Sequence, residues 1–589
     1  MTRATLEAEI RRRAAVFLSQ SHLPVDYYRI RRRVAYPLPV RSIQLPGMPV
    51  GDLTSYPWAT WMTWALEERI ECLGWAAEWL GDAAARTAAA RDLEALAAWP
   101  SYRQYEQPDL SLGHSARTLW HAHAHWKWLD PALRAKIETA FARIVSDLLP
   151  LSEQKHGAYS RKEDILALPE PHKLLHNIPI IGTVGAALAA NASAHPSAAL
   201  FNRRLHVLLG ALLDLRERGH TEGVAYDGYV MDFAADWLCS LPAAERAPLL
   251  NHPRLNDGLE ESYLLAAPGA AAEVAELSDV EPRRMPFHLS ALAKLELLAP
   301  EPRRAWHLRR CPVEGLRADA LAALHTRAPA QAERPASQAP AAGALDAHYA
   351  LVLRSGWEAA DLAVAIAASN SPMGHIHCDG GSMVIGTAGR WLITDPGYQQ
   401  YMQKKEREFT LGPTAHNAPV FNGLAQDRKA VRRLAREDRR DGLLRAKLDL
   451  TACYPQILRI DLAVRTVWLW GQRFVVVADE VQGAMVLTQA YHWHGHGEAA
   501  WWVQDGWASL CLPGAGNQPL WITSPQAALS GACIDRLPGS RGQLALVAFA
   551  DVKAPVVWWV FAYGPQPPEV ALAEGGRGLT VAGQRLTAE

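Results

Sequence analysis

The chain changes character at residues 326–347, TRAPAQAERPASQAPAAGALDA, where Ala, Pro, Gln and Ser follow one another without a hydrophobic period. Such a composition is typical of a linker or a mobile surface loop. A chain of 589 residues is also too long for a single hydrophobic core. We therefore predict two domains, formed by residues 1–325 and 348–589, with this segment as the linker between them.

The residues before the boundary have the period of helices. Residues 58–99 are rich in Ala, Leu and Glu, with Trp and Leu at intervals of three and four and a break near Gly81 and Asp82. Further amphipathic runs follow between short Pro, Gly or Asp interruptions: 115–128, 131–149, 180–192, 198–217 and 229–240. Helices in series without strand signals favour antiparallel hairpins, arranged as a bundle, a solenoid or an α/α toroid. No repeated sequence period selects the solenoid.

The residues after the boundary have the period of strands. They alternate between the two faces and are rich in β-branched side chains, as in DLAVAIAAS (361–369), RFVVVADEV (473–481) and APVVWWVFAYG (554–564). Many short strands separated by Gly, Asp and Asn turns predict a large antiparallel β-sandwich. The predicted fold class is therefore multidomain α+β, with a helical half followed by a β half.

Charge and cysteine content limit the classes of function. A net charge of −1 and a pI of about 7.1 argue against a general nucleic-acid or membrane-surface binder. No apolar run is as long as a membrane span, and the start of the sequence lacks the apolar core of a signal peptide. We therefore expect a cytoplasmic protein, or a periplasmic or secreted one if a signal peptide has been removed. Seven scattered cysteines without a CxxC pair suggest free or buried thiols.

Three short pieces of the β half carry a concentration of histidine and aspartate. They read GHIHCDGGSMVI (374–385), GRWLITDPGYQQYM (389–402) and TAHNAPVFNG (414–423). On a strand, side chains alternate between faces, so His375, His377 and Asp379 would project to the same side. Such a pattern is also found on the polar faces of sheets and in hydrogen-bonded pairs of core histidines.

Two further residues of these pieces suggest a metal site. Asp395 stands at a strand end, because the Asp-Pro-Gly that begins with it is a turn signal, and His416 lies in a loop of small residues. Imidazole nitrogen and carboxylate oxygen suit zinc and related divalent ions. Two histidines and one aspartate from three segments therefore form a candidate metal site.

These pieces, HxHxDGGS, WLITDPG and AHN, resemble the signature of the heparinase II/III-like family of polysaccharide lyases, which cleave uronic-acid polymers by β-elimination. The resemblance implies an incomplete (α/α) toroid followed by a large antiparallel β-sandwich. It also implies one divalent metal ion, zinc in some members, held for a structural purpose at His377, Asp395 and His416. The position of His375 belongs to the active site of the family.

A second piece of the resemblance lies in the helical half, in EGVAYDGY, residues 222–229. The family has a catalytic tyrosine in an EGxxY motif, and Tyr226 is the matching position. Tyr229 is the alternative one turn further on, and Glu222 and Tyr229 are candidates for substrate binding. Many relatives have Trp after the catalytic tyrosine, where this chain has Asp227.

A third piece, LHNIP at residues 175–179, precedes a predicted helix. An Asn at such a place commonly caps the helix. By the resemblance, Asn177 instead neutralises the carboxylate of the substrate, with His176 beside it. Some members have a basic His directly after this Asn, where this chain has Ile178.

The chemistry that these residues suggest is removal of the C5 proton of a 4-linked uronide. Donors on the neighbouring carboxylate stabilise the enolate-like intermediate, which is the role of Asn177. Tyr226 would protonate the departing O4 and could also act as the base, while His375 titrates near neutral pH and suits proton abstraction. The assignment requires the two halves of the chain to meet at a substrate cleft. Arg407, between two motif pieces, is a further candidate for binding an acidic chain.

Other interpretations remain open at this point. A glycoside hydrolase would need two carboxyl groups, drawn from Glu222, Asp227 and Asp232, whereas elimination needs none. A non-catalytic acidic-glycan-binding protein is the third alternative. The predicted partner is in each case an acidic polysaccharide or oligosaccharide, and a homodimer is left open.

Two more groups of histidines could in principle bind metal. The sequence YHWHGH at residues 491–496 places three histidines on one face of a strand, and His121 and His125 are four residues apart on a predicted helix. We interpret the first group as a polar sheet face, because it lacks an aspartate and a matched loop. Trp and Ala neighbours favour packing for the second group.

Overall fold

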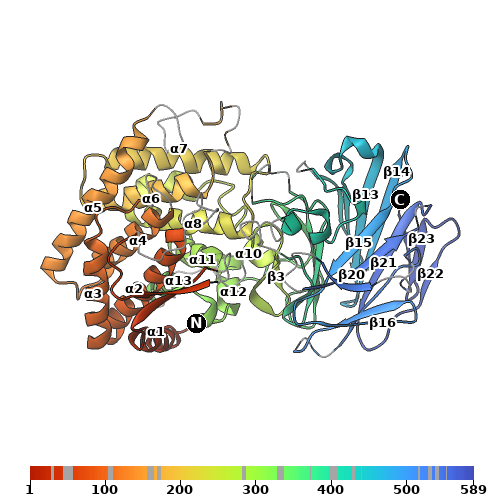
Figure 1. Ribbon diagram of the computed structural model, residues 1–589, viewed down its shortest axis with the longest axis horizontal. Helices are drawn as coiled ribbons and strands as arrows, with labels where there is room; N and C mark the ends of the chain where they lie inside the picture. Colours follow the sequence, from red (N-terminus) through yellow and green to blue (C-terminus); the bar gives the residue numbers. More distant parts are fainter. Residues whose placement is uncertain are drawn as a thin grey trace. The chain divides into compact units, whose positions relative to one another are not determined.

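The computed structural model describes the chain except for residues 28–31, 44–57, 104–109, 155–164, 169–170, 172–173, 281–286, 328–336, 370, 372, 374, 397–407, 428–430, 440, 515, 517, 528, 530–532, 538–542, 552 and 589. The chain forms two compact units. The helical unit comprises Met1–Glu217, Tyr226–Leu259 and Pro286–Ala339. The β unit comprises Arg218–Ala225, Glu260–Met285 and Pro340–Glu589. In Figure 1 the colours run from red through green for the helices to blue for the last strands.

Helices occupy most of the described N-terminal half. Their bounds are α1 Arg3–Leu18, α2 Trp58–Leu80, α3 Ala83–Ala97, α4 Leu110–His125, α5 Pro131–Ser152, α6 Asn177–Ala192, α7 Ala198–Arg216, α8 Val224–Ser240, α9 Ala243–Leu250, α10 Glu261–Leu264, α11 Phe287–Leu298, α12 Pro302–Arg310 and α13 Ala318–Arg327. In the described part of the chain, no helix is both long and apolar enough to cross a lipid bilayer.

The predicted break near Gly81 and Asp82 is confirmed, and local chemistry explains it. Gly81 has a positive φ of 66°, a conformation that ends α2 and that glycine adopts without steric cost. The Asp82 side chain then accepts hydrogen bonds from the backbone N–H groups of Ala84 and Ala85, at 2.9 and 3.0 Å. This cap satisfies amide groups at the start of α3 that have no partner within the helix.

Helices α4 and α6 approach so closely that their backbones nearly touch. A Cβ atom on Gly185 of α6 would lie 2.9 Å from the Cα of Gly113 on α4. A Cβ atom on Gly113 would lie 2.5 Å from the side chain of Ile181. The two glycines therefore permit a crossing that larger residues would force apart.

The sequence analysis predicted no strand before residue 326, and this prediction is wrong. Strands β1 (His22–Tyr27) and β2 (Arg32–Pro37) form an antiparallel pair in which Val25 is opposite Val34. Strands β3 (Ala266–Ala267) and β4 (Ala270–Val274) form a second pair. Such short strands contain too few alternating positions to stand out from the helical pattern around them.

Most strands of the β unit belong to three antiparallel sheets and a smaller outer one. The five-stranded sheet consists of β5 Gly343–Asp346, β6 Ala350–Arg354, β7 Leu362–Ala367, β8 Met383–Thr387 and β9 Arg390–Ile393. The four-stranded sheet has the order β10 Val420–Phe421, β15 Gln489–His494, β20 Leu544–Ala550 and β19 Cys533–Arg536. The eight-stranded sheet has the order β11 Arg432–Asp438, β12 Leu444–Asp449, β13 Ile460–Trp470, β14 Phe474–Gly483, β21 Val556–Tyr563, β18 Leu520–Thr523, β17 Trp507–Cys511 and β16 Ala500–Gln504. The three-stranded sheet contains β22 Val570–Leu572, β23 Gly578–Val581 and β24 Gln584–Thr587.

The centre of the eight-stranded sheet is buried on both faces, as strand β14 shows. Val475 and Val477 belong to the large core that this sheet shares with the five- and four-stranded sheets. Val476 and Ala478 point the other way, into a smaller core shared with β23 and β24. Alternation of side chains along the strand therefore produces a layered sandwich from one continuous apolar run.

The boundaries of the two units differ from the predicted linker in detail. Helix α13 extends to Arg327, and β5 already begins at Gly343, inside the segment predicted as the linker. Residues 328–336 of that segment lie outside the described residues. The β unit also includes two earlier segments, Arg218–Ala225 and Glu260–Met285, which the sequence analysis had assigned to the helical half.

Candidate functional site

The predicted histidines and aspartates of the β unit stand on loops that leave the five-stranded sheet. His375 and His377 lie between β7 and β8, and not on a strand as predicted. The strand begins only at Met383, because the backbone N–H of Ser382 donates to the Asp379 carbonyl at 2.7 Å in a turn in which Gly381 has a φ of 77°. His375 and His377 therefore lie near each other because of the loop conformation, and not because they alternate along a strand.

A residue that the sequence analysis did not consider, Asp279, joins the two histidines. His375 donates from Nδ1 to Asp279 Oδ2, and His377 donates from Nε2 to Asp279 Oδ1, both at 2.8 Å. The Asp279 side chain is completely buried. Asp279 precedes His375 by 96 residues, in the short sequence LSDV, so no local motif could have indicated it.

His375 is the more accessible of the two histidines. Its side chain is 12% exposed, whereas that of His377 is completely buried. Its second ring nitrogen, Nε2, lies 3.6 Å from Oε1 of Glu222, a residue of the predicted EGxxY motif. Glu222 itself is buried, so the structure places this carboxylate beside the candidate base.

Next to these histidines, one nitrogen of His377 and one of His416 have no hydrogen-bond partner among the described residues. They are His377 Nδ1 and His416 Nε2, and both are buried. Ligand atoms of His377, Asp379 and His416 lie within 4.8 Å of one another. Burial raises the pKa of the Asp379 carboxyl, against the opposing effect of the two histidines. Buried nitrogens without partners next to a carboxylate are the donor set of a zinc site, so these residues fit a divalent metal.

Asp395, which we predicted as a metal ligand, contacts one of these histidines. Its Oδ2 accepts hydrogen bonds from His416 Nδ1 at 3.0 Å and from Ser382 Oγ at 3.2 Å. A carboxylate on the far nitrogen of a metal-binding histidine fixes the orientation of the ring. The carboxylate grouped with the two histidines is that of Asp379, so the geometry favours Asp379 over the predicted Asp395 as the carboxylate ligand.

The next residue, Asn417, holds the loop of His416 in place. Its Nδ2 donates to the carbonyl oxygens of Met383 and Thr394, each at 2.8 Å. Its Oδ1 accepts from the backbone N–H of His494 at 2.8 Å. One buried amide thus ties the loop to β8, the end of β9 and β15, which explains the Asn of the AHN sequence.

Comparison with known families identifies this part of the chain. Residues 337–583 match the family model described as Heparinase II/III-like, C-terminal. The β unit contains a heparinase II/III-like C-terminal domain. The resemblance that the sequence motifs suggested is thereby confirmed. A comparison with curated proteins gave no significant match.

Two solved structures share the fold of the chain as a whole. Heparan sulfate lyase HepC from Pedobacter heparinus has a TM-score of 0.58 and 13% sequence identity, over 98% of this chain and 88% of that chain. A heparinase III structure has a TM-score of 0.58 and 12% identity, over 98% of this chain and 89% of that chain. The predicted fold class, an incomplete (α/α) toroid followed by an antiparallel β-sandwich, is confirmed.

The helical unit contains the predicted catalytic residues that precede the heparinase-like domain. Helix α6 begins at Asn177, which is buried, and its N-cap is His176, whose side chain makes no capping hydrogen bond. The alternative that Asn177 caps the helix is therefore wrong. Tyr226 is buried in the first turn of α8. The catalytic roles of these residues, and their meeting with His375 in a cleft, stay predictions.

Tyr229 is placed differently from what a substrate-binding role requires. Its side chain is completely buried, and its hydroxyl contacts His114 Nε2 and accepts a hydrogen bond from Trp64 Nε1 at 3.1 Å. Burial lowers the pKa of His114 to about 4 despite the nearby Glu67 carboxylate. The neutral ring then donates from Nδ1 to Glu67 and accepts from the tyrosine. These contacts assign Tyr229 to the interior of the helical unit and not to a sugar-binding surface.

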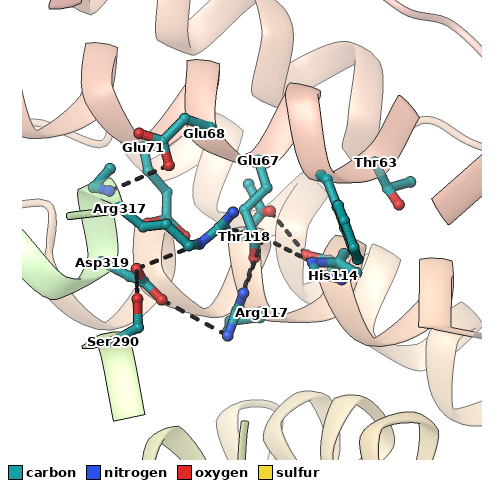
Figure 2. Close-up of polar contacts among 12 residues, drawn as sticks. Thr63, Glu67, Glu68, Glu71, His114, Arg117, Thr118, Ser290, Arg317 and Asp319 are labelled. Atoms are coloured by element: carbon teal, nitrogen blue, oxygen red, sulfur yellow. Dashed lines mark hydrogen bonds and ion pairs between the residues drawn. The ribbon is translucent and has the colours of Figure 1, made fainter. Parts of the chain in front are cut away.

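His114 belongs to a buried network of charged side chains, part of which Figure 2 shows. Glu67 accepts from His114 at 2.7 Å, from Arg117 Nε and Nη2 at 2.7 and 2.9 Å, and from Arg317 at 2.7 Å. Arg117 and Arg317 together hold the pKa of the Glu67 carboxyl well below its ordinary value, although burial raises it. A single carboxylate therefore connects α2, α4 and the segment before α13.

Lys294 occupies the centre of the second half of this network. Its Nζ donates to Asp232, Asp236 and Asp319 at 2.6, 2.6 and 2.7 Å. Ligand atoms of these three aspartates lie within 4.8 Å of one another, as in a metal site. The ammonium group already neutralises them, so this cluster is an internal ion-pair network that joins α8, α11 and α13.

Two residues of the other histidine groups singled out in the sequence, His494 and His121, have hydrogen-bond partners. His494 of β15 donates from Nε2 to the Thr414 carbonyl at 2.7 Å, and burial lowers the pKa of both His492 and His494 to about 4. His121 donates to Glu71 at 2.7 Å within the buried network. The sequence favoured a polar sheet face for the first group and packing for the second, whereas the structure places His121 in ion pairs with Glu71 and Asp236. Arg407 lies outside the described residues.

Proposed function

We propose that the protein is a polysaccharide lyase that cleaves a 4-linked uronic-acid-containing polysaccharide by β-elimination and leaves an unsaturated uronic acid. The heparinase II/III-like domain over residues 337–583 agrees with this enzyme class. Two solved structures, one described as a heparan sulfate lyase and the other as a heparinase III, share the fold of the chain. A glycosaminoglycan-like polymer is therefore the substrate class to test first.

The observation that supports the proposal most is the environment of His375. A buried carboxylate accepts the hydrogen of Nδ1, which leaves the lone pair of the neutral ring on Nε2, the nitrogen nearer Glu222. A histidine oriented in this way can accept a proton from carbon through Nε2. His375 also remains partly exposed, whereas the other histidines around Asp279 and Asp395 are buried.

The remaining roles follow the family resemblance. Tyr226 would protonate the departing O4, and Asn177 would donate to the carboxylate of the uronide as negative charge develops on it. Such preorganised donors commonly contribute roughly 3–4 kcal/mol each to transition-state stabilisation. Acid and base groups in position contribute about 10²–10⁴-fold each.

A divalent ion would be held by His377 Nδ1, His416 Nε2 and the Asp379 carboxylate. When bound, it would supply positive charge that clamps the loop of His377 to the loop of His416. Asp279 and Asp395 accept from the far nitrogens of the two rings, as partners of metal-binding histidines commonly do. The ion's purpose would thus be structural, and His375, two residues from His377, would be positioned by the same loop.

The hydrolase alternative loses one of its carboxylates in this structure. Asp232 accepts from Lys294 through Oδ1 and from Arg117 through Oδ2, and its side chain is completely buried. Hydrolysis requires two carboxyl groups on either side of the glycosidic bond. Asp232 is held by these two cations, which leaves Glu222 and Asp227 as the remaining carboxylates of the predicted set.

The proposal is tested by ultraviolet absorbance of the products from a panel of acidic polysaccharides. Wild-type protein should generate the absorbing unsaturated uronide from at least one of them, and His375→Gln should lower the turnover about 10²-fold or more. His252→Gln serves as the control, because the His252 ring lies in the helical unit, where it contacts Asp214 and the backbone N–H of Arg254. Turnover by His375→Gln equal to that of the control would reject the role of His375.

A further inference from the structure

We propose that Asp279 is a positioning residue that imposes opposite tautomers on His375 and His377 through the two oxygens of one carboxylate. The inference rests on the proposed function for the role of His375, but the tautomers themselves can be measured without turnover.

The contacts of Asp279 leave little freedom to either ring. Both hydrogen bonds measure 2.8 Å, and they reach different nitrogens, Nδ1 of His375 and Nε2 of His377. An ionised carboxylate can only accept hydrogen bonds. Each of the two contacted nitrogens must therefore carry its hydrogen, and in a neutral ring the lone pair lies on the other nitrogen.

This arrangement gives two histidines of one short sequence different capabilities. In the neutral ring His375 has its lone pair on Nε2, which lies 3.6 Å from Glu222 Oε1 and is the nitrogen to which the proposed function assigns proton transfer. His377 has its lone pair on Nδ1, the buried nitrogen without a hydrogen-bond partner that belongs to the group with Asp379 and His416. The Asp279 carboxylate therefore gives His375 the tautomer of a base and His377, two residues away, the tautomer of a metal ligand.

The backbone around Asp279 is fixed to the same loop. The Asp279 N–H donates to the His375 carbonyl at 3.0 Å, so main chain and side chain both hold the histidine. Ser278, immediately before it, has a φ of 60°, which is rare for a residue with a Cβ atom. A Cβ on Gly223 would lie 2.4 Å from Ser278 Oγ, so the segment of Glu222 packs directly against this turn.

Replacement of Asp279 by Asn distinguishes positioning from packing. Asn has almost the same shape, but its amide offers one acceptor oxygen and one donor nitrogen. The asparagine oxygen can accept a hydrogen bond from the N–H of only one imidazole. The other ring must either move its hydrogen to the opposite nitrogen or lose its hydrogen bond to residue 279. If Asp279 merely filled space, the exchange would change little.

The test compares zinc-loaded wild type and Asp279→Asn by NMR of ¹⁵N-histidine-labelled protein, with His375→Gln and His377→Gln variants to assign the two rings. In wild type we expect hydrogen on Nδ1 of His375 and on Nε2 of His377, and in Asp279→Asn we expect the position of the hydrogen to change on at least one ring. Asp361→Asn is the matched control, since Asp361 is a buried acceptor of Ser355 and Gln472 elsewhere in the β unit. It should leave both rings unchanged.

Kinetic and zinc-binding measurements complete the test. In Asp279→Asn, kcat or zinc affinity should fall roughly 10–100-fold with little change in KM, as for other partners of metal-binding histidines. The inference would be overturned if the wild-type tautomers were opposite to those stated. It would also be overturned if the Asp279→Asn protein had unchanged tautomers, kcat and zinc affinity. Absence of turnover in wild type with the stated tautomers present would reject the proposed function and leave the role of Asp279 intact.

Discussion

Arg465 of β13 donates from Nη1 to the carbonyl oxygen of Asn417 at 2.7 Å, and so ties the loop of His416 to the middle of the eight-stranded sheet. The same nitrogen donates to the Gly381 carbonyl at 2.6 Å, on the loop of His377. The remaining nitrogens, Nε and Nη2, pair with both oxygens of Asp479 on the neighbouring strand. One guanidinium thus connects two of the loops that carry the candidate site to the core of the sandwich.

Arg465→Lys should destabilise the protein although it conserves the charge. A lysine has no planar fork, so it cannot serve Asp479 and both carbonyls together. Disruption of a buried ion pair lowers the free energy of unfolding by about 3–5 kcal/mol. Because lysine retains the charge, we expect a smaller loss here, of roughly 2 kcal/mol or more. Urea unfolding measures the change. Arg432→Lys, at an exposed pair with Asp449, should change stability by less than about 1 kcal/mol. Equal effects of the two variants would contradict the anchoring role of Arg465.

Lys294→Met should strongly destabilise the helical unit. It would leave Asp232, Asp236 and Asp319 buried together with less positive charge among them. Removal of one partner from a buried ion-pair network costs about 3–5 kcal/mol. The free energy of unfolding checks this. Lys136→Met at an exposed pair with Glu94 is the control and should be almost neutral. A Lys294→Met protein as stable as this control would show that the aspartates are protonated.

The buried network also predicts a dependence of stability on pH. Although burial lowers the pKa of His121, the carboxylates of Glu71 and Asp236 raise it to about 10. A pKa that is raised in the folded state contributes stability below the unfolded value, near 6.5, and loses it as pH rises toward 10. The free energy of unfolding should therefore decline over this range. Glu71, whose pKa burial raises to about 7, adds a decline in the same direction at lower pH.

His121→Gln is the variant that isolates this effect. Glutamine retains hydrogen-bonding capacity but does not titrate, so the decline between about pH 6.5 and 10 should become shallower. Denaturant unfolding at several pH values measures the slope. The outcome that contradicts the assignment is an identical slope in wild type and variant.

Metal removal should loosen the loops of the heparinase-like domain. Chelation is expected to lower the melting temperature by several degrees and added zinc to restore it, because an ion bound at a hundred times its Kd stabilises by about 2.7 kcal/mol. His416→Ala should abolish the change in melting temperature between the chelated and the zinc-loaded protein, since it deletes one of the proposed ligands. His492→Gln replaces a buried histidine outside the group of His377, Asp379 and His416, and should retain that change. A melting temperature of the wild type that is indifferent to zinc would contradict the proposed metal site.

Helices and strands could be predicted from the sequence where their hydrophobic pattern extends over many residues. The period of residues 58–99 and the alternation of residues 473–481 each extend over several turns or strand positions, and both types of element are confirmed. The pairs β1–β2 and β3–β4 were missed because each strand is short. The assignment of Glu222 to the β unit depends on contacts made far along the chain, such as that with His375, which no local pattern contains.

The candidate site was predictable where it is encoded in contiguous sequence. His375, His377 and His416 stand in motifs that could be recognised, and the structure brings His377 and His416 together. Asp279 and Arg465 could not be found in this way, because each acts across a long separation in the chain and stands in an ordinary sequence context. Their roles follow only from the geometry of buried hydrogen bonds.

The most direct test of the central claim is mass spectrometry of the products formed from a defined, 4-linked uronic-acid oligosaccharide. Elimination breaks the bond between C4 of the uronide and O4, and no water is added. The masses of the two products should therefore sum to the mass of the substrate. Hydrolysis would add the mass of one water. The account predicts the first result, with the mass deficit on the fragment that carries the new double bond; the second result would contradict it.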